Sequence, residues 1–147
     1  MKGYISLDKM TNHHEGYLSL DKMSNHHVNL YNKVVNILNL ENPDIDPALG
    51  IIISVIKPGG YVHSHRDLYS SFPNTKHLTN KRNVRFNVMV DRGEDNCYNP
   101  KIEDKFYEVN RCDGWCFAAS VYRHRTELVS GPEYRVVYQF GFCMDAI

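Results

Sequence analysis

Short apolar runs separated by turn residues make up most of the chain after Gly50. Such runs, rich in Val, Ile, Tyr and Phe, predict β-strands when Pro, Gly, Asn and Asp mark their ends. The turns read Pro-Gly-Gly, Asp-Arg-Gly, Cys-Asp-Gly and Ser-Gly-Pro. Short strands at this spacing predict a barrel or a sandwich. The predicted strands are Ile51–Ile56, Tyr61–Asp67, Val84–Val90, Lys105–Val109, Gly114–Ala118, Tyr122–Leu128 and Tyr134–Phe142.

A different period precedes these strands. Tyr31, Val34, Val35 and Leu38 recur at helical spacing, and Ser24 or Asn25 stands where a helix N-cap is expected. The sequence therefore predicts one amphipathic helix here. Residues 41–50 are rich in Pro and acidic residues and predict a loop.

The chain begins with a direct repeat. GYISLDKMTNHH, from Gly3, is followed by GYLSLDKMSNHH, from Gly16, and the two copies differ only by Ile/Leu and Thr/Ser. Two copies are too few for a stacked repeat architecture, which needs about three units. We therefore expect residues 1–27 to be a local duplication preceding a domain of residues 28–147, within a single structural domain overall. We expect the His-His pair of each copy to lie on a solvated surface, because adjacent side chains diverge.

Size and charge limit the possible functions. The chain has 147 residues, and 17 Lys and Arg balance 17 Asp and Glu, so no overall charge favours nucleic acid. The start MKGYISLDKM lacks the layout of a secretory signal, and no apolar run is long enough for a membrane span. We expect a cytoplasmic protein with no nucleic-acid or membrane partner. Its four cysteines then predict free thiols, with Cys116 and Cys143 as small core residues.

One group of residues has the spacing of a metal site. In VHSHRDLYS, His65 and Asp67 are two residues apart, so on a strand both would point to the same face. His124 follows far downstream in the strand-like VYRHRTEL. A His-x-Asp pair completed by a distant His is typical of the facial triad of non-haem Fe(II) oxygenases, which leaves positions open for an α-keto acid and O2. His63 would share the face of His65 and Asp67, and its participation stays open.

A keto diacid also needs a cation for its distal carboxylate. Arg135 lies eleven residues after His124, at the start of the last predicted strand, and its guanidinium can pair with a carboxylate in a bidentate way. Arg85 and Asn87 in NVRFNVMV share one strand face. A buried Arg85 would need an anionic partner, and a bound carboxylate would be one.

These segments together resemble the aspartyl/asparaginyl β-hydroxylase family and its relatives that hydroxylate free proline. The resemblance rests on ISVIKPGGYVHSHRD, NVRFNVMV and GWCFAASVYRHRTELVSGPEYRVVYQF and covers about residues 51–142. It implies a double-stranded β-helix (jelly-roll, cupin-like) core with one or two N-terminal helices. It also implies a dioxygenase that uses Fe(II), 2-oxoglutarate and O2 to hydroxylate an amino acid, free or within a peptide or protein.

The resemblance also assigns roles to residues. It implies that His65 and His124 bind iron, that Ser54 and Arg135 hold the distal carboxylate of 2-oxoglutarate, and that Arg85 lies near the co-substrate or substrate. The chain departs from the family in Asn87, which stands where a histidine is common. Some members lack the acidic ligand, whereas this chain has Asp67. The residues from Leu68 to Arg82 look like a flap that selects the substrate.

Two other functions fit the same sequence. A cupin-like metalloprotein could bind a metal without using 2-oxoglutarate. A non-catalytic β-barrel binding module could use the N-terminal repeat as its working part, with the His and Asp residues unrelated to function.

Overall fold

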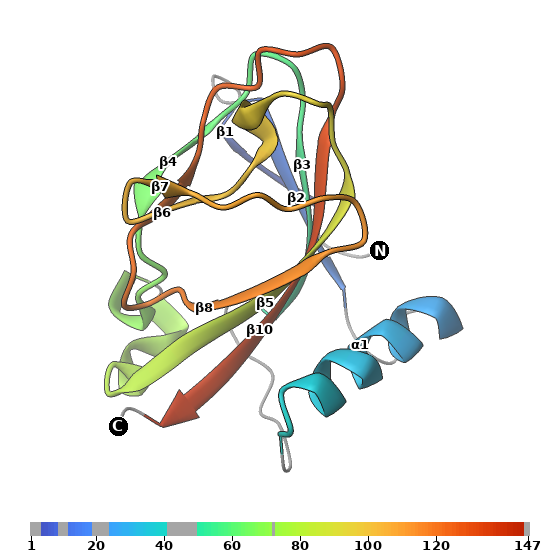
Figure 1. Ribbon diagram of the computed structural model, residues 1–147. Helices are drawn as coiled ribbons and strands as arrows, with labels where there is room; N and C mark the ends of the chain where they lie inside the picture. Colours follow the sequence, from blue (N-terminus) through green and yellow to red (C-terminus); the bar gives the residue numbers. More distant parts are fainter. Residues whose placement is uncertain (1–3, 9–11, 19–23, 41–49, 72, 146–147) are drawn as a thin grey trace.

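The protein is mainly β, with two antiparallel sheets and one α-helix in the part of the chain that the computed structural model describes, residues 4–8, 12–18, 24–40, 50–71 and 73–145 (Figure 1). The larger sheet has the order β1 (Tyr4–Asp8), β2 (His13–Leu18), β3 (Ile51–Ile56), β10 (Arg135–Asp145), β5 (Lys81–Asp91) and β8 (Gly114–Ala118). The smaller sheet has the order β4 (Val62–His65), β9 (His124–Thr126), β6 (Lys101–Ile102) and β7 (Lys105–Phe106). The helices are α1 (Asn25–Ile37) and the 3-10 turns η2 (Tyr69–Ser71), η3 (Pro73–Leu78) and η4 (Asn96–Tyr98).

The prediction of a mainly β chain with one helix is therefore confirmed. β3 and β8 have the predicted bounds, β5 and β10 are longer, and β4, β7 and β9 are shorter. The smaller sheet is made of strands of two to four residues, whereas β5 and β10 have eleven residues each. The long central pair is thus the frame to which the short strands are added.

The N-terminal repeat contributes two strands to the larger sheet. β1 pairs with β2, and β2 pairs with β3 along its whole length, from His13 opposite Ile56 to Leu18 opposite Ile51. His13 is buried on this strand, so the expected solvated surface is wrong for this residue. The second copy behaves differently: its His26 is exposed at the start of α1.

Helix α1 begins at a capped end. Ser24 has extended backbone angles, and its hydroxyl accepts the backbone N–H of His27, which satisfies one of the free donors of the first turn. Tyr31 and Val34 are buried, as their spacing predicts, and pack with Val35 and Leu38 against the larger sheet. The cap and the apolar face together fix where the helix starts and how it lies.

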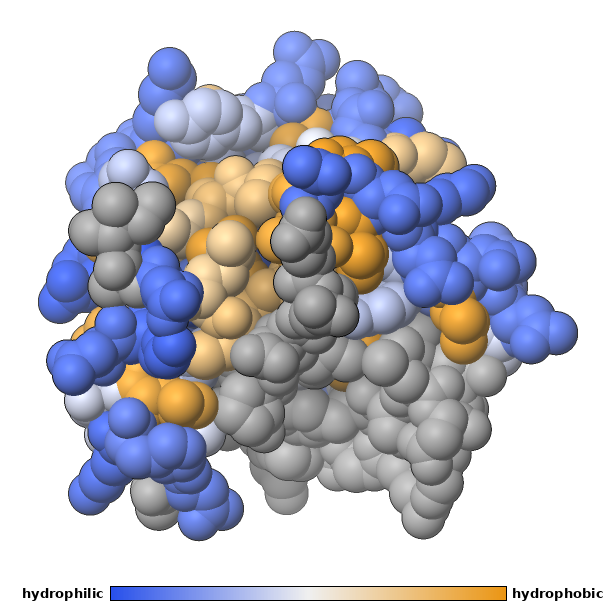
Figure 2. All heavy atoms as spheres, turned by 90° about the horizontal axis from the view of Figure 1, so that it is seen from below, coloured by the Kyte–Doolittle hydropathy of each residue, from blue (hydrophilic) through white to orange (hydrophobic). Residues whose placement is uncertain are grey.

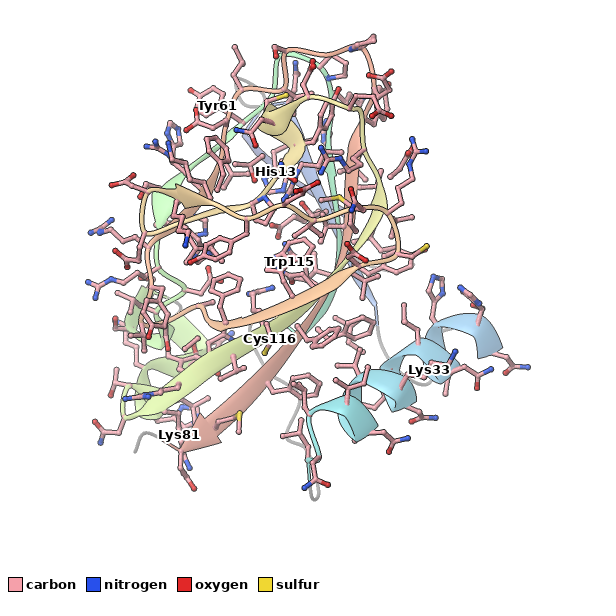
Figure 3. The ribbon with its side chains drawn as sticks, in the orientation of Figure 1. His13, Lys33, Tyr61, Lys81, Trp115 and Cys116 are labelled. Carbon is pink, nitrogen blue, oxygen red and sulfur yellow. The ribbon has the colours of Figure 1, made fainter. Side chains whose placement is uncertain are left out.

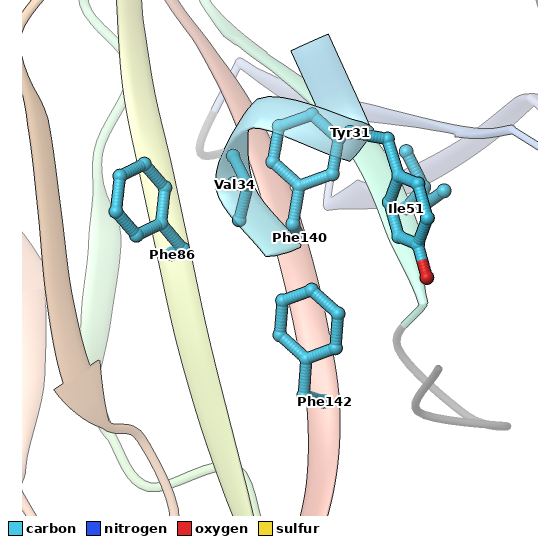
Figure 4. Packing of buried hydrophobic residues seen from close by; sticks show 6 residues of the cluster. All are labelled: Tyr31, Val34, Ile51, Phe86, Phe140 and Phe142. Carbon is cyan, nitrogen blue, oxygen red and sulfur yellow. The ribbon is translucent and has the colours of Figure 1, made fainter. Parts of the chain in front are cut away.

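The main hydrophobic core lies between α1 and the larger sheet. Figure 4 shows Tyr31 and Val34 of the helix above side chains from β3, β5 and β10. Phe140 and Phe142 on β10 point to this side, because residues two apart on a strand share a face. Arg135 and Gln139 of the same strand point to the other side. The buried members of the cluster are Tyr31, Val34, Ile51, Phe86, Phe140 and Phe142.

The cysteines are free, as predicted, but they are not core residues. Cys116 is exposed and Cys143 is intermediate, so the prediction that both are small core hydrophobes is wrong for Cys116. Figure 3 shows Trp115 and Cys116 on opposite sides of β8, as strand alternation requires. Trp115 takes the inner side and leaves Cys116 on the outer one.

Residues 68–82, which look like a flap in the sequence, contain η2, η3 and the start of β5. Tyr69 and Thr75 are buried, and the Thr75 hydroxyl donates to the carbonyl of Tyr69 at 3.1 Å. Figure 2 shows the molecule from below Figure 1, where apolar side chains gather in the middle of the face and hydrophilic ones lie along its left, upper and right margins. Among the described residues no helix is long and apolar enough to cross a membrane.

Candidate metal centre

The strand that carries His65 begins at a tight turn. Pro58 and Gly59 are the central residues, Gly59 has a φ of +83°, and the N–H of Gly60 donates to the carbonyl of Lys57 at 2.8 Å. Pro followed by a residue with positive φ is the pattern of a type II turn, in which glycine is preferred at the second position. The Pro-Gly-Gly sequence thus ends β3 and sends β4 across to the smaller sheet.

His65 and His124 lie opposite each other on two neighbouring strands of the smaller sheet. They are direct partners in the antiparallel pairing of β4 and β9, and their ring centroids are 4.3 Å apart. Asp67 follows β4, where its backbone N–H donates to the carbonyl of Ala119 at 2.9 Å. One ligand atom from each of His65, Asp67 and His124 lies within 4.8 Å of the other two. The structure thus brings together the three residues that the sequence singled out.

Backbone contacts fix which ring nitrogen of His65 and of His124 faces Asp67. Nδ1 of His65 is 2.7 Å from the carbonyl oxygen of His63, and Nδ1 of His124 is 3.0 Å from that of Tyr122. A carbonyl only accepts, so both Nδ1 atoms carry protons. In neutral rings the Nε2 atoms are then bare acceptors, and they lie 3.3 and 3.6 Å from the carboxylate oxygens of Asp67. Acceptors that face each other repel unless a proton or a cation lies between them.

Arg85 keeps the carboxyl group of Asp67 ionised. Its Nε donates to Oδ2 of Asp67 at 2.8 Å, and both side chains are largely buried. Burial by itself raises the pKa of Asp67, but Arg85, with the contacts from His124 and His65, outweighs burial and holds that pKa well below its ordinary value. Burial lowers the pKa of His65, whereas Asp67 raises it, and the net change is upward.

Arg85 thus has a partner other than the one expected. The sequence suggested a bound carboxylate, but within the described residues its Nε pairs with Asp67 and its terminal nitrogen donates to Gln139 at 3.1 Å. Asn87, two residues on, is buried beside the same cavity, and its Oδ1 has no hydrogen-bond partner among the described residues. Asn87 therefore offers a free acceptor to a ligand.

A cavity of about 300 Å³ lies between the two sheets and contains the triad. Its size is at the lower end of the range for small-molecule sites. Figure 3 shows His13 and Trp115 inside the molecule, between the sheets, and Tyr61 toward the edge. The residues on the side of the larger sheet are His13, Glu15, Ser54, Arg85, Asn87, Trp115, Phe117, Arg135 and Gln139.

Arg135 lies against this cavity without a carboxylate partner. It is 4% exposed, its Nε donates to the carbonyl of Tyr98 at 2.9 Å, and among the described residues no carboxylate oxygen lies within 4.0 Å of it. Burial lowers the pKa of Arg135 to about 10, with a further contribution from Arg92, so it stays cationic near neutrality. A buried cation without an anionic partner is costly, and an anionic ligand would relieve that cost.

Ser54 reaches the same cavity but already has a partner. Its hydroxyl is 2.8 Å from Nε2 of His13, and both residues are buried. Pairing of β2, β3 and β10 puts His13, Ile56 and Arg135 in one row across the sheet. Ser54 lies two residues from Ile56 on the same face, so the hydroxyl, the imidazole and the guanidinium border one part of the cavity.

His63 lines the cavity but is not part of the group formed by His65, Asp67 and His124. Its side chain is exposed, and its ring packs edge-on against Tyr61 at 4.9 Å between centroids. Its carbonyl is what orients the ring of His65. His63 thus contributes to the centre through its backbone.

His13 and Glu15 are among the cavity residues that sequence reasoning missed. Both come from the N-terminal repeat region, and the signal that could have found them is the alternation of His13 and Glu15 on one strand face, as for His65 and Asp67.

Compared with known proteins, the chain matches no family model and no curated protein.

Proposed function

We propose that this chain is an Fe(II)- and 2-oxoglutarate-dependent dioxygenase that hydroxylates an amino acid, free or as a residue of a peptide or protein. The observation that carries the proposal is the meeting of His65, Asp67 and His124, with ligand atoms within 4.8 Å of one another. Two imidazoles and one carboxylate are the donor set of non-haem Fe(II) oxygenases.

The residues fit a divalent metal. Both Nε2 atoms and an oxygen of Asp67 turn toward one another, and a cation between them would remove the repulsion between these acceptors. Backbone carbonyls behind each imidazole and Arg85 behind the carboxylate are the kind of supporting contacts that orient metal ligands. Iron bound there would supply activation of O2 coupled to oxidative decarboxylation of 2-oxoglutarate to succinate and CO2.

Arg135 supports the choice of a dianionic co-substrate. It is buried beside the cavity that holds the triad, and no described carboxylate pairs with it. Its guanidinium can hold the distal carboxylate, and the Ser54 hydroxyl can add a hydrogen bond. Arg135 and Ser54 are both buried, and charge interactions and hydrogen bonds are stronger away from bulk water.

The arrangement of the sheets is compatible with a double-stranded β-helix. The two antiparallel sheets enclose the cavity, and the triad lies on the smaller one. We propose that the fold is of this jelly-roll, cupin-like type and that the chain is related to the aspartyl/asparaginyl β-hydroxylases.

The test is anaerobic addition of Fe(II) and then 2-oxoglutarate, monitored in the visible range for the weak charge-transfer band of the chelate. We expect the band with the wild type and its loss in His124→Ala. The matched control is His26→Ala, an exposed histidine outside the cavity, which should behave as the wild type. Admission of O2 should then give succinate.

Other results would support the alternatives. Tight metal binding without the band and without succinate would indicate a cupin-like metalloprotein that does not use 2-oxoglutarate. Absence of metal binding, equal in wild type and His124→Ala, would refute the proposal and favour a binding module.

A further inference from the structure

Glu15 is a carboxylate inside the cavity for which the proposed chemistry gives no role. It lies on β2 directly opposite Ser54 of β3, so both side chains point to the cavity side of the sheet. Its side chain is 14% exposed. A carboxylate so buried is normally paired or fully hydrogen-bonded.

Glu15 has no hydrogen bond and no permanently charged partner among the described residues. Nε2 of His13 lies 3.6 Å from Oε1 of Glu15, beyond hydrogen-bond distance, and pairs with it only when His13 is protonated; that nitrogen is 2.8 Å from the Ser54 hydroxyl. Among the described residues no Lys or Arg nitrogen lies within 4.0 Å of it and no group donates a hydrogen bond to it. Burial raises the pKa of Glu15, and Arg85, which lowers it, is already bonded to Asp67 and Gln139.

Two other features of the cavity wall suit a positively charged group of a ligand, whereas Arg135 on the same wall suits a carboxylate. Trp115 and Phe117 of β8 line the cavity, and aromatic faces attract cations. The Oδ1 of Asn87 is a buried acceptor without a partner among the described residues, and it could accept an N–H. The cavity therefore holds two free acceptors, one of them a carboxylate, beside aromatic rings.

We propose that Glu15 binds a positively charged nitrogen of the primary substrate. The substrate would then be an amino acid that brings a primary ammonium, secondary ammonium or guanidinium group into the cavity. This inference rests on the proposed function in calling the bound molecule a substrate. The binding of a positively charged nitrogen to Glu15 does not itself depend on iron. It also gives the N-terminal repeat a role, because the strand that it forms carries Glu15.

The test uses pairs of probes that differ by one positive charge: L-lysine and Nε-acetyl-L-lysine, L-arginine and L-citrulline, and L-proline and N-acetyl-L-proline. Binding is measured by calorimetry or ligand-observed NMR, with Zn(II) in place of iron so that no turnover occurs, and again without metal. For at least one pair we expect the charged member to bind the wild type at least tenfold more tightly than the neutral one.

Glu15→Gln keeps the shape and removes the charge, so the preference should fall to near one. Glu108→Gln, an exposed carboxylate away from this cavity, is the matched control and should keep the preference. Zn(II) affinity, measured by competition with a chelator, should be the same in all three proteins.

Three outcomes would overturn the inference. The first is no charge preference in the wild type for any pair, which decides the matter even if Glu15→Gln does not fold. The second is a preference that survives in a folded Glu15→Gln variant. The third is a large loss of Zn(II) affinity in that variant, which would make Glu15 a metal ligand. If charge preference persists while the Fe(II) and 2-oxoglutarate band is absent, the proposed function fails and this inference stands.

Discussion

Nε of Arg85, on the long central strand β5, donates to Oδ2 of Asp67 at 2.8 Å and joins the larger sheet to the residue that follows β4. This ion pair connects the two sheets at the candidate centre. It keeps Asp67 ionised and oriented, and a carboxylate must be ionised to serve as a metal ligand. The position of the third ligand is thus set by a residue that would not touch the metal.

Replacement of Arg85 should therefore weaken metal binding. In Arg85→Gln we expect about 10- to 100-fold lower Zn(II) or Fe(II) affinity, in line with the effect of losing other groups that support metal ligands. Competition with a chelator measures this metal affinity. Arg111→Gln, which removes an exposed ion pair with Asp91 at 2.9 Å, is the control and should leave metal affinity unchanged. Equal affinities in both variants would contradict this role of Arg85.

Replacement of Arg135 should weaken the binding of the co-substrate and leave the binding of the metal unchanged. Arg135→Ala leaves the triad in place but removes the partner of the distal carboxylate, so we expect the Kd for 2-oxoglutarate to rise at least tenfold with metal affinity unchanged. Titration of 2-oxoglutarate into the anaerobic Fe(II) protein, followed at the visible band, gives this Kd. An unchanged Kd in a folded variant would show that the anchor lies elsewhere.

His13 should make stability depend on pH. Burial, followed by Arg135, His14 and His65, lowers its pKa from 6.5 to about 4, while Glu15 lies 3.6 Å away. The unfolded chain binds the proton more readily, so the contribution is complete above pH 6.5 and is lost as the pH falls toward 4. The full contribution of His13 to the free energy of unfolding is about 3 kcal/mol.

Urea unfolding of the metal-free protein between these pH values measures the effect of His13. The wild type should lose more stability on acidification than His13→Gln, because only the wild type takes up this proton on unfolding. Parallel pH profiles for the two proteins would show that the side chain is protonated equally in the folded and unfolded states.

The core beneath α1 should dominate stability. Phe142 is 1% exposed, and Phe142→Ala should cost about 3–5 kcal/mol of unfolding free energy. Ile37, at the end of α1, is 67% exposed, and Ile37→Ala should change stability by less than about 0.5 kcal/mol. Urea denaturation at constant m-value compares them. A similar cost for both would mean that the aromatic cluster is loosely packed.

The sequence predicted the strands whose own residues form a clear local pattern. Ile51–Ile56 is a continuous apolar run before a Pro-Gly turn, and Gly114–Ala118 follows Cys-Asp-Gly, so local patterns define both. β6, with two residues, has no period from which it could be predicted, and β7 was predicted but is shorter than expected. β1 and β2 were missed because their edge of the sheet depends on pairing with β3, a long-range contact that no local pattern reveals.

The three candidate metal ligands were predictable from the sequence motif. His65 and Asp67 lie two residues apart, and the motif pointed to a distant histidine, His124, although β4 ends at His65 and Asp67 follows it. The role of Arg85 was not predictable, since a strand pattern shows which face a side chain takes but not which partner it meets across the cavity. Glu15 was missed because it lies between two copies of a repeat that drew attention to the histidines.

The repeat shows that nearly the same amino-acid sequence can form two different structures. Asn12-His13-His14 leads into a strand, whereas Asn25-His26-His27 opens a helix. A single Asn-His-His stretch could begin either β2 or α1, but not both. The two copies of the twelve-residue segment therefore let one chain form both the strand that carries Glu15 and the capped start of the helix that packs on the core.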